Sequence, residues 1–188
     1  MRIQPFLKAL PILLIAVLTI YSMKKSSAQK AEMPVDNPDI PANLKEYEVV
    51  EKSIHDGDTL RVRSPELGTV LKIRFACIDA PELKQPLGEE SRNYLRSLVN
   101  RGGNKVKVQP ITVDKYGRTV AQLWNNGGLL NSQMAGAGMA YGYEQYKKDC
   151  PNYPAIESMQ SQAKSESLGV WKLPGGGQKP WDYRKSKK

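Results

Sequence analysis

The sequence predicts a mainly β domain of the α+β class, a five-stranded Greek-key barrel of the OB type with about three helices packed outside it. Short runs with strand-like alternation dominate the first half of the chain and recur after one helical segment. This order fits a small closed sheet in a chain of 188 residues. With 40% hydrophobic and 25% charged residues, the composition excludes an acidic disordered tail and a polytopic membrane protein.

The first three strands form a predicted meander. A strand opens at 47–51, residues 60–63 alternate with period two, and residues 70–78 form a longer run rich in β-formers. Asp56-Gly57 and 65–68 supply turns between these runs.

The second half mixes helices and strands. Tyr94, Leu95, Leu98 and Val99 have helical spacing within a segment from about 89 to 100, which Gly102-Gly103 would end. Strand patterns follow at 105–108 and 119–124, with a turn at 125–128. We expect a short helix near 130–137 and a longer one near 155–167, with Ile156, Met159 and Ala163 on one face.

The chain divides into four predicted regions. Residues 1–28 combine Arg2 and Lys8 with a short apolar run, which indicates a signal peptide or, alternatively, an uncleaved N-terminal anchor. Residues 29–46 form a Pro-containing linker, 47–172 the folded domain and 173–188 a basic tail rich in Gly, Lys and Arg. We therefore expect an extracytoplasmic protein, secreted or membrane-anchored, that contacts a membrane only through its N-terminal segment.

The positive charge lies at the two ends. Of the net charge of +9, residues 1–28 and 175–188 carry nearly all, so the body is almost neutral and its charge is weak evidence for nucleic-acid binding. We expect the tail to lie on the surface or to be mobile. A solvated end is the favoured interpretation, and extra attraction for phosphate is the alternative.

Two cysteines and one histidine limit the chemistry. They cannot build a Cys/His zinc site or a two-histidine acid–base mechanism, so oxygens must hold any metal. Cys77 and Cys150 could form a disulfide in an oxidising compartment, or Cys77 could be a buried free thiol. His55 is expected to be a solvent-facing residue at a strand end.

Four polar clusters have ordinary explanations when taken one by one. Residues 56–59 and 114–118 could be hairpin turns, Arg74 an exposed strand position, and 79–82 a strand end. Taken together they indicate more, because one strand carries Arg74 and ends in Asp79 and Glu82 where it opens into a loop.

With Ala163-Lys164 and Gly169-Val170-Trp171, these clusters resemble the thermonuclease family typified by staphylococcal nuclease, in order from about Val49 to Trp171. The resemblance implies a monomeric, calcium-dependent nuclease that hydrolyses DNA and RNA with little sequence specificity and leaves 3′-phosphate ends. A non-catalytic OB-fold module that binds nucleic acid or protein is the alternative.

The resemblance also assigns roles to residues. It implies one Ca²⁺ ion, with Mg²⁺ as the alternative, since carboxylates and carbonyls are hard ligands. It implies two arginines that clamp phosphate and a glutamate as general base. It also implies a nucleotide pocket with a second tyrosine, for which Tyr143 and Tyr146 are the alternatives because Glu144 stands at the matching position. The implied catalytic residues are Arg74, Glu82 and Arg118; the metal ligands are Asp58, Asp79 and the backbone carbonyl of Ala80; the substrate-binding residues are Lys115, Tyr116 and Tyr143 or Tyr146.

Overall fold

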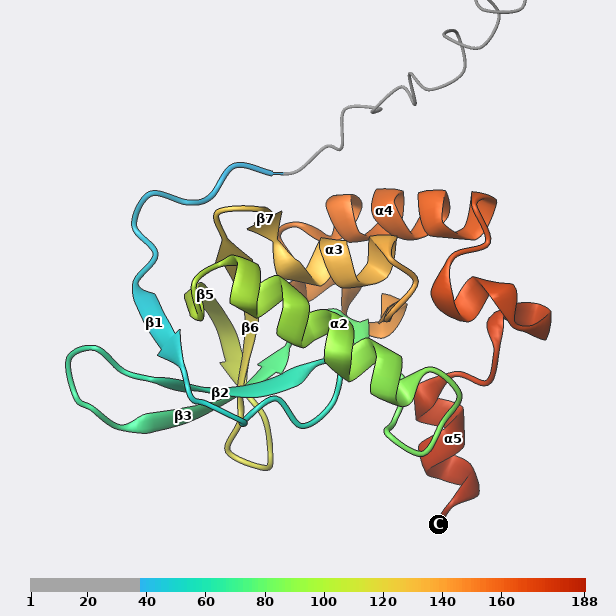
Figure 1. Ribbon diagram of the computed structural model, residues 1–188, viewed down its shortest axis with the longest axis horizontal. Coiled ribbons are helices and arrows are strands. Elements are labelled where there is room, and N and C mark those ends of the chain that lie inside the picture. The colour runs from blue at the N-terminus through green and yellow to red at the C-terminus, as the bar shows by residue number, and fades with distance from the viewer. Residues whose placement is uncertain (1–37) are drawn as a thin grey trace, which may run out of the picture. The chain divides into compact units, whose positions relative to one another are not determined.

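The computed structural model describes residues 38–188, which lie in one compact unit (Figure 1). The predicted signal peptide or anchor, and most of the predicted linker, lie outside the described residues. Within residues 38–188, no helix combines the length and the apolar character that crossing a membrane requires.

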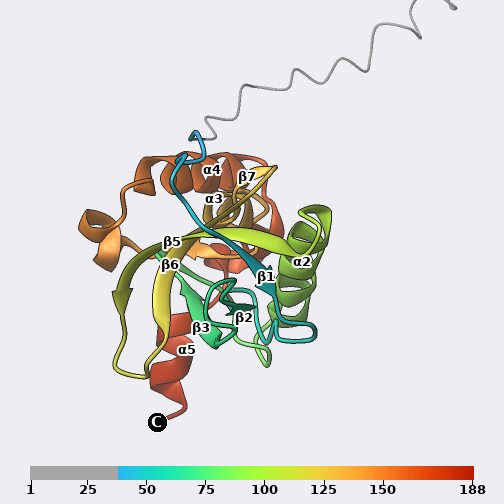
Figure 2. The same cartoon turned by 90° about the vertical axis from the view of Figure 1, so that its left-hand side faces the viewer.

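Five strands close into the predicted OB-type barrel. They are β1 (Glu46–Val49), β2 (Thr59–Arg63), β3 (Val70–Phe75), β5 (Lys105–Val113) and β6 (Thr119–Asn125). Their order is β3-β2-β1-β5-β6, and a parallel pairing of β3 with β6, in which Arg74 lies opposite Val120, closes the sheet. Figure 2 shows β2, β3, β5 and β6 as curved strands of this closed sheet.

The strand predicted at 70–78 is interrupted, which corrects that prediction. β3 ends at Phe75 because Cys77 adopts a left-handed backbone conformation with φ 62°, which a strand cannot accommodate. The chain resumes as β4 (Ile78–Asp79), which pairs with β8 (Tyr141–Gly142) instead of with the barrel. This break turns the end of the predicted strand out of the barrel.

The strand predicted at 105–108 is longer than expected. β5 continues to Val113 through an irregularity between Pro110 and Thr112, which lets a proline sit within the strand. β6 then turns back through β7 (Gly128–Leu129).

The three predicted helices are present as α2 (Gly88–Arg101), α3 (Leu130–Gly136) and α4 (Tyr153–Ser165). The connections contain three short 3₁₀ segments, η1 (Glu144–Asp149), η2 (Gly169–Lys172) and η3 (Pro174–Gly176). In Figure 1, α3 and α4 lie together on one side of the barrel, and α2 crosses in front of it.

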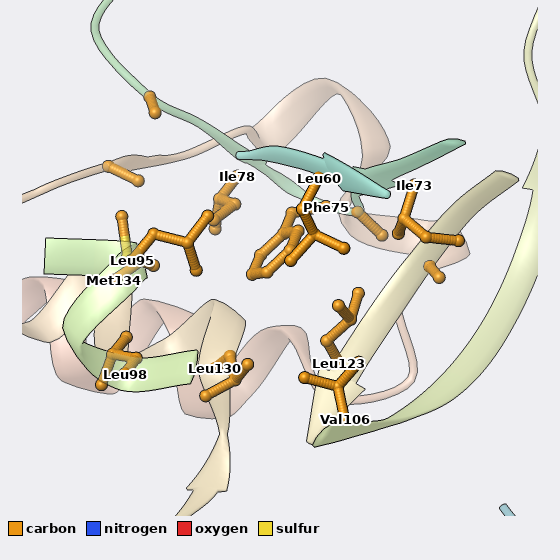
Figure 3. Packing of buried hydrophobic residues seen from close by; sticks show 14 of the residues in the cluster. Leu60, Ile73, Phe75, Ile78, Leu95, Leu98, Val106, Leu123, Leu130 and Met134 are labelled. Carbon is orange, nitrogen blue, oxygen red and sulfur yellow. The ribbon is translucent and has the colours of Figure 1, made fainter. Parts of the chain in front are cut away.

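The core lies between the barrel and the helices (Figure 3). Phe75, Ile73 and Leu123 come from the strands and are at most 1% exposed, and helical side chains cover them. These helical residues are Leu95, Leu98, Leu130 and Met134. Because burial of each large apolar side chain contributes about 1.5–3 kcal/mol, this cluster fixes the barrel strands that carry the polar residues described below.

The basic tail differs from the expected solvated end. Residues 180–186 form α5, and Trp181 and Tyr183 are only partly exposed. Trp181 and Arg184 are three residues apart, so they share a helix face, and that face contacts the rest of the domain. The seven residues of α5 show no apolar periodicity, and for this reason the sequence pattern did not indicate the helix.

Candidate active site

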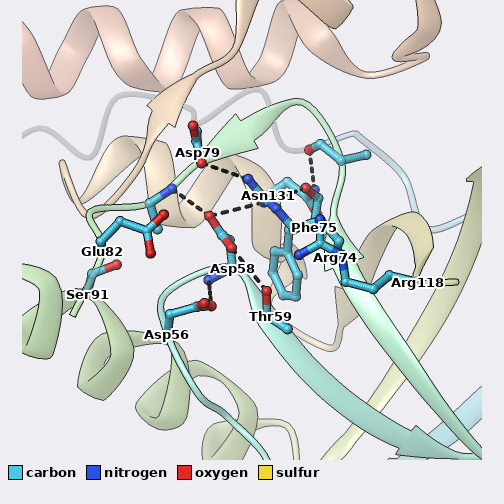
Figure 4. A network of polar contacts seen from close by, with 12 residues as sticks. Asp56, Asp58, Thr59, Arg74, Phe75, Asp79, Glu82, Ser91, Arg118 and Asn131 are labelled. Atoms are coloured by element: carbon cyan, nitrogen blue, oxygen red, sulfur yellow. Dashed lines mark hydrogen bonds and ion pairs between the residues drawn. The ribbon is translucent and has the colours of Figure 1, made fainter. Parts of the chain in front are cut away.

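Arg74 joins two aspartates at one end of the barrel. Its Nη1 lies 3.0 Å from Oδ2 of Asp58, and its Nη2 lies 2.8 Å from Oδ1 of Asp79 (Figure 4). Arg74 comes from β3, Asp58 directly precedes β2, and Asp79 ends β4. Because the chain breaks after Phe75, Asp79 in β4 lies next to Arg74 in β3 and forms an ion pair with it.

The turn before β2 fixes the position of Asp58. The Asp56 carboxylate accepts a hydrogen bond from the Asp58 backbone N–H at 3.1 Å, and the Ala80 N–H donates to Oδ2 of Asp58 at 2.6 Å. Gly57 lies so close to Ser91 on α2 that a side chain there would collide with the serine. The Asp-Gly turn is therefore a packed element that holds one carboxylate against the opposite strand end.

Both aspartates are buried, and this has an electrostatic consequence. Burial raises the pKa of Asp58 well above its ordinary value, although Arg74 acts in the opposite direction. The ion pairs of Arg74 with both carboxylates offset part of the cost of burying them.

Arg118 is held from the turn between β5 and β6. Oδ2 of Asp114 accepts a hydrogen bond from its Nε at 2.7 Å, and Oδ1 accepts the backbone N–H groups of Tyr116 and Arg118. Burial alone would raise the pKa of Asp114, but these hydrogen bonds outweigh it, and the pKa lies below its ordinary value. Asp114 thus keeps its charge and orients the arginine, a role that the sequence motif did not reveal.

These groups line one pocket of about 770 Å³. Of the predicted nucleotide-pocket residues, all within the described part of the chain, Lys115 alone does not line it; its ammonium lies 5.2 Å from the centre of the Tyr116 ring. Tyr143 and Tyr146 both line the pocket, with ring centroids 5.1 Å apart in an edge-to-face arrangement. Burial, first of all, raises the pKa of Tyr143. The other predicted site residues that the structure brings together here are Asp58, Arg74, Asp79, Ala80, Glu82, Tyr116 and Arg118.

A disulfide fixes one wall of the pocket. Cys77 is bonded to Cys150, which settles the two alternatives that the sequence left open. The Tyr143 N–H also donates to the Cys77 carbonyl oxygen at 2.8 Å. The strand end that carries Asp79 and the segment that carries both tyrosines are therefore tied together.

His55 is exposed, as expected.

Arg184 on α5 enters the same pocket, which sequence reasoning missed. Its guanidinium spans both oxygens of Asp79, with Nη1 to Oδ1 at 3.1 Å and Nη2 to Oδ2 at 2.6 Å, and Nη1 lies 2.8 Å from Oε1 of Glu82. Hydrogen bonds to Asp79, and then to Glu82, raise the pKa of Arg184 further above its ordinary value. The Arg-Lys run of the tail was the one sequence signal at this position.

The oxygen atoms of this pocket suit a hard divalent cation in their chemistry, but the protein side chains supply only part of a coordination shell. Among residues 38–188, no cluster of three or more Asp, Glu, His or Cys side chains is arranged to hold a metal unaided. Asp58, Asp79 and the Ala80 carbonyl offer only oxygen, which suits Ca²⁺ or Mg²⁺ with water completing the coordination.

Comparison with known proteins gives a consistent result. The sequence model of the family described as "Staphylococcal nuclease homologue" matches residues 72–173. The chain is 35% identical over 137 residues to an uncharacterized endonuclease of Escherichia coli, covering 70% of this chain and 81% of that protein. It is 35% identical over 144 residues to a micrococcal nuclease of Shigella flexneri, covering 72% and 79%.

The plant relatives are much longer proteins. The probable staphylococcal-like nuclease CAN3 of Oryza sativa subsp. japonica is 37% identical over 117 residues, which are 62% of this chain and 29% of CAN3. The chain spans 30% of the rice relative CAN2.

Proposed function

Because the chain belongs to the family of staphylococcal nuclease homologues, we propose that it is a metal-dependent nuclease that hydrolyses the phosphodiester bonds of DNA and RNA. The observation that carries the proposal is the contact of Arg74 with both Asp58 and Asp79 in a pocket that Arg118 and Glu82 also line. That pocket combines cationic donors for a phosphate with oxygen ligands for a metal.

The two arginines would bind the phosphate. A guanidinium presents a planar fork that matches two phosphate oxygens, and it keeps its charge at neutral pH. Arg74 is anchored by Asp58 and Asp79, and Arg118 by Asp114, so both would be oriented before the substrate arrives. Such fixed donors stabilise the charge that develops on the phosphoryl oxygens. Since phosphates carry no sequence information, the proposed cleavage has little sequence specificity.

Asp58, Asp79 and the Ala80 carbonyl would hold the cation, for which we propose Ca²⁺ with Mg²⁺ as the alternative. When bound, such an ion polarises a phosphate oxygen and lowers the pKa of coordinated water.

Glu82 would accept a proton from the attacking water. It lies three residues beyond Asp79, lines the pocket and is half-buried, so its carboxylate can face both water and substrate. By resemblance to thermonucleases, we propose that the products carry a 3′-phosphate and a free 5′-hydroxyl. Tyr116, Tyr143 and Tyr146 would supply ring surfaces for a nucleotide.

We also propose an extracytoplasmic location. The apolar segment at the N-terminus and the disulfide between Cys77 and Cys150 support it, because structural disulfides persist in oxidising compartments. The proposed form is a monomer.

The test is digestion of supercoiled plasmid and single-stranded RNA by the purified protein with Ca²⁺, Mg²⁺ or a chelator. Arg74→Ala should lower cleavage of both substrates by about 10²–10³-fold, the usual effect of removing a fixed donor to the reacting group. Arg101→Ala removes an exposed arginine at the end of α2, outside the pocket, and should leave cleavage unchanged. Circular dichroism must show that both variants are folded. Cleavage of neither substrate by the folded protein would instead support a binding module.

A further inference from the structure

The C-terminal arm, residues 174–188, is docked on the pocket. Gly176 accepts a hydrogen bond from the Tyr141 hydroxyl at 2.6 Å, and Gln178 accepts one from the Gln85 side chain at 3.1 Å. The Lys179 ammonium lies 4.2 Å from the centre of the Tyr141 ring. The arm therefore has a defined position before α5 begins.

One face of α5 completes the docking. Trp181 stacks on Tyr143 with ring centroids 4.9 Å apart and planes 2° from parallel, and Arg184 reaches Asp79 and Glu82 from the next turn. Asp79 lies opposite Tyr141 in the pairing of β4 with β8. The arm thus spans a continuous surface that runs from β8 to the carboxylates.

Docking uses the oxygens that the proposed function needs. Oδ2 of Asp79 lies 2.6 Å from Arg184, and Oδ1 is shared between Arg184 and Arg74. A cation bound to Asp79 and the Arg184 guanidinium would compete for the same lone pairs, and two positive charges at that separation repel each other. The stacked Trp181 also covers one face of Tyr143.

Resting on the proposed function for its cation, we propose that the C-terminal arm is an autoinhibitory segment: Arg184 occupies Asp79 and Glu82, and the divalent cation must displace it. The free protein then holds its own guanidinium where the cation belongs. Release of the arm uncovers both carboxylates and the Tyr143 ring together, because Trp181 and Arg184 leave on the same helix.

Calcium affinity tests the competition without any cleavage assay. Arg184→Gln removes the competing guanidinium, and Lys185→Gln is its matched control. It removes the same charge from the neighbouring position, where Lys185 forms an ion pair with Asp182 within α5. If nine in ten molecules hold the arm docked, Arg184→Gln should bind Ca²⁺ about tenfold more tightly by isothermal titration calorimetry. Lys185→Gln should stay within about twofold of the unmodified protein, as expected for one exposed charge.

The position of the arm supplies a second readout. The fluorescence of Trp181 is obtained as the difference between the protein and its Trp181→Phe variant. If Ca²⁺ releases the arm, saturating Ca²⁺ should expose Trp181, and acrylamide should then quench this fluorescence more strongly. Equal calcium affinity in the protein and in Arg184→Gln, or a Trp181 signal that Ca²⁺ leaves unchanged, would overturn the proposal. If neither the protein nor Arg184→Gln bound Ca²⁺ or Mg²⁺, the metal assignment of the proposed function would fail, and the competition with it.

Discussion

The Nε of Arg118 donates a hydrogen bond to Oδ2 of Asp114 at 2.7 Å, and both residues lie in the turn between β5 and β6. The aspartate also accepts the backbone N–H of Arg118 through its other oxygen at 3.0 Å. One carboxylate therefore sets both the shape of the turn and the direction of the arginine that we propose as a phosphate ligand.

Removing this carboxylate should impair cleavage although Asp114 would not touch the substrate. We expect Asp114→Ala to lower kcat by about ten- to a hundredfold, because a misplaced catalytic group costs up to about 10²-fold in rate. Glu66→Ala, on an exposed residue of the loop between β2 and β3, is the control. An Asp114→Ala variant with unchanged kcat would show that Arg118 needs no such support.

The buried Asp58 should make stability depend on pH. Its pKa is raised in the folded state from an ordinary value of 3.8, so the wild type loses stability as pH rises from about that value through the folded pKa. Asp58→Asn lacks this titration. In chelator, urea unfolding should therefore show the variant gaining stability relative to the wild type as pH rises from 3 to 7. A constant difference across that range would refute the account of Asp58.

Reduction of the disulfide should destabilise the fold. Cys77 and Cys150 are 73 residues apart, and closing a loop of that length stabilises a protein by about 4 kcal/mol in the chain-entropy account. Urea denaturation with and without a reductant, beside a Cys77→Ser, Cys150→Ser double variant, measures the effect. The double variant should match the reduced protein and should not respond to the reductant; equal stability of the oxidised and reduced proteins would contradict the prediction.

Sequence patterns predicted the barrel, and the resemblance to the thermonuclease family predicted several residues that line the pocket. The alternation in β2 and β3, and the helical spacing of Leu95, Leu98 and Val99, are local signals that the packing preserves. The ordered motifs of that family predicted Asp58, Arg74, Asp79, Glu82 and Arg118 as site residues, and all five line one pocket.

Two features needed the fold. The break at Cys77 depends on a single left-handed residue in an apolar run, which propensity does not reveal. The docking of Arg184 on Asp79 joins positions 105 residues apart, and no local pattern encodes such a contact. Lys115 shows the converse, because the family resemblance predicted it in the nucleotide pocket, whereas Lys115 does not line the pocket in the structure.

The most direct test of the central claim is single-turnover cleavage of one short DNA oligonucleotide in Ca²⁺, with product masses read by mass spectrometry. The protein should yield fragments that end in a 3′-phosphate. The Glu82→Gln, Arg118→Ala double variant should be slower by at least about 10³-fold, because it lacks both the proposed base and a phosphate ligand. Cleavage by the folded double variant at the rate of the unmodified protein would contradict the assignment of this pocket as the active site.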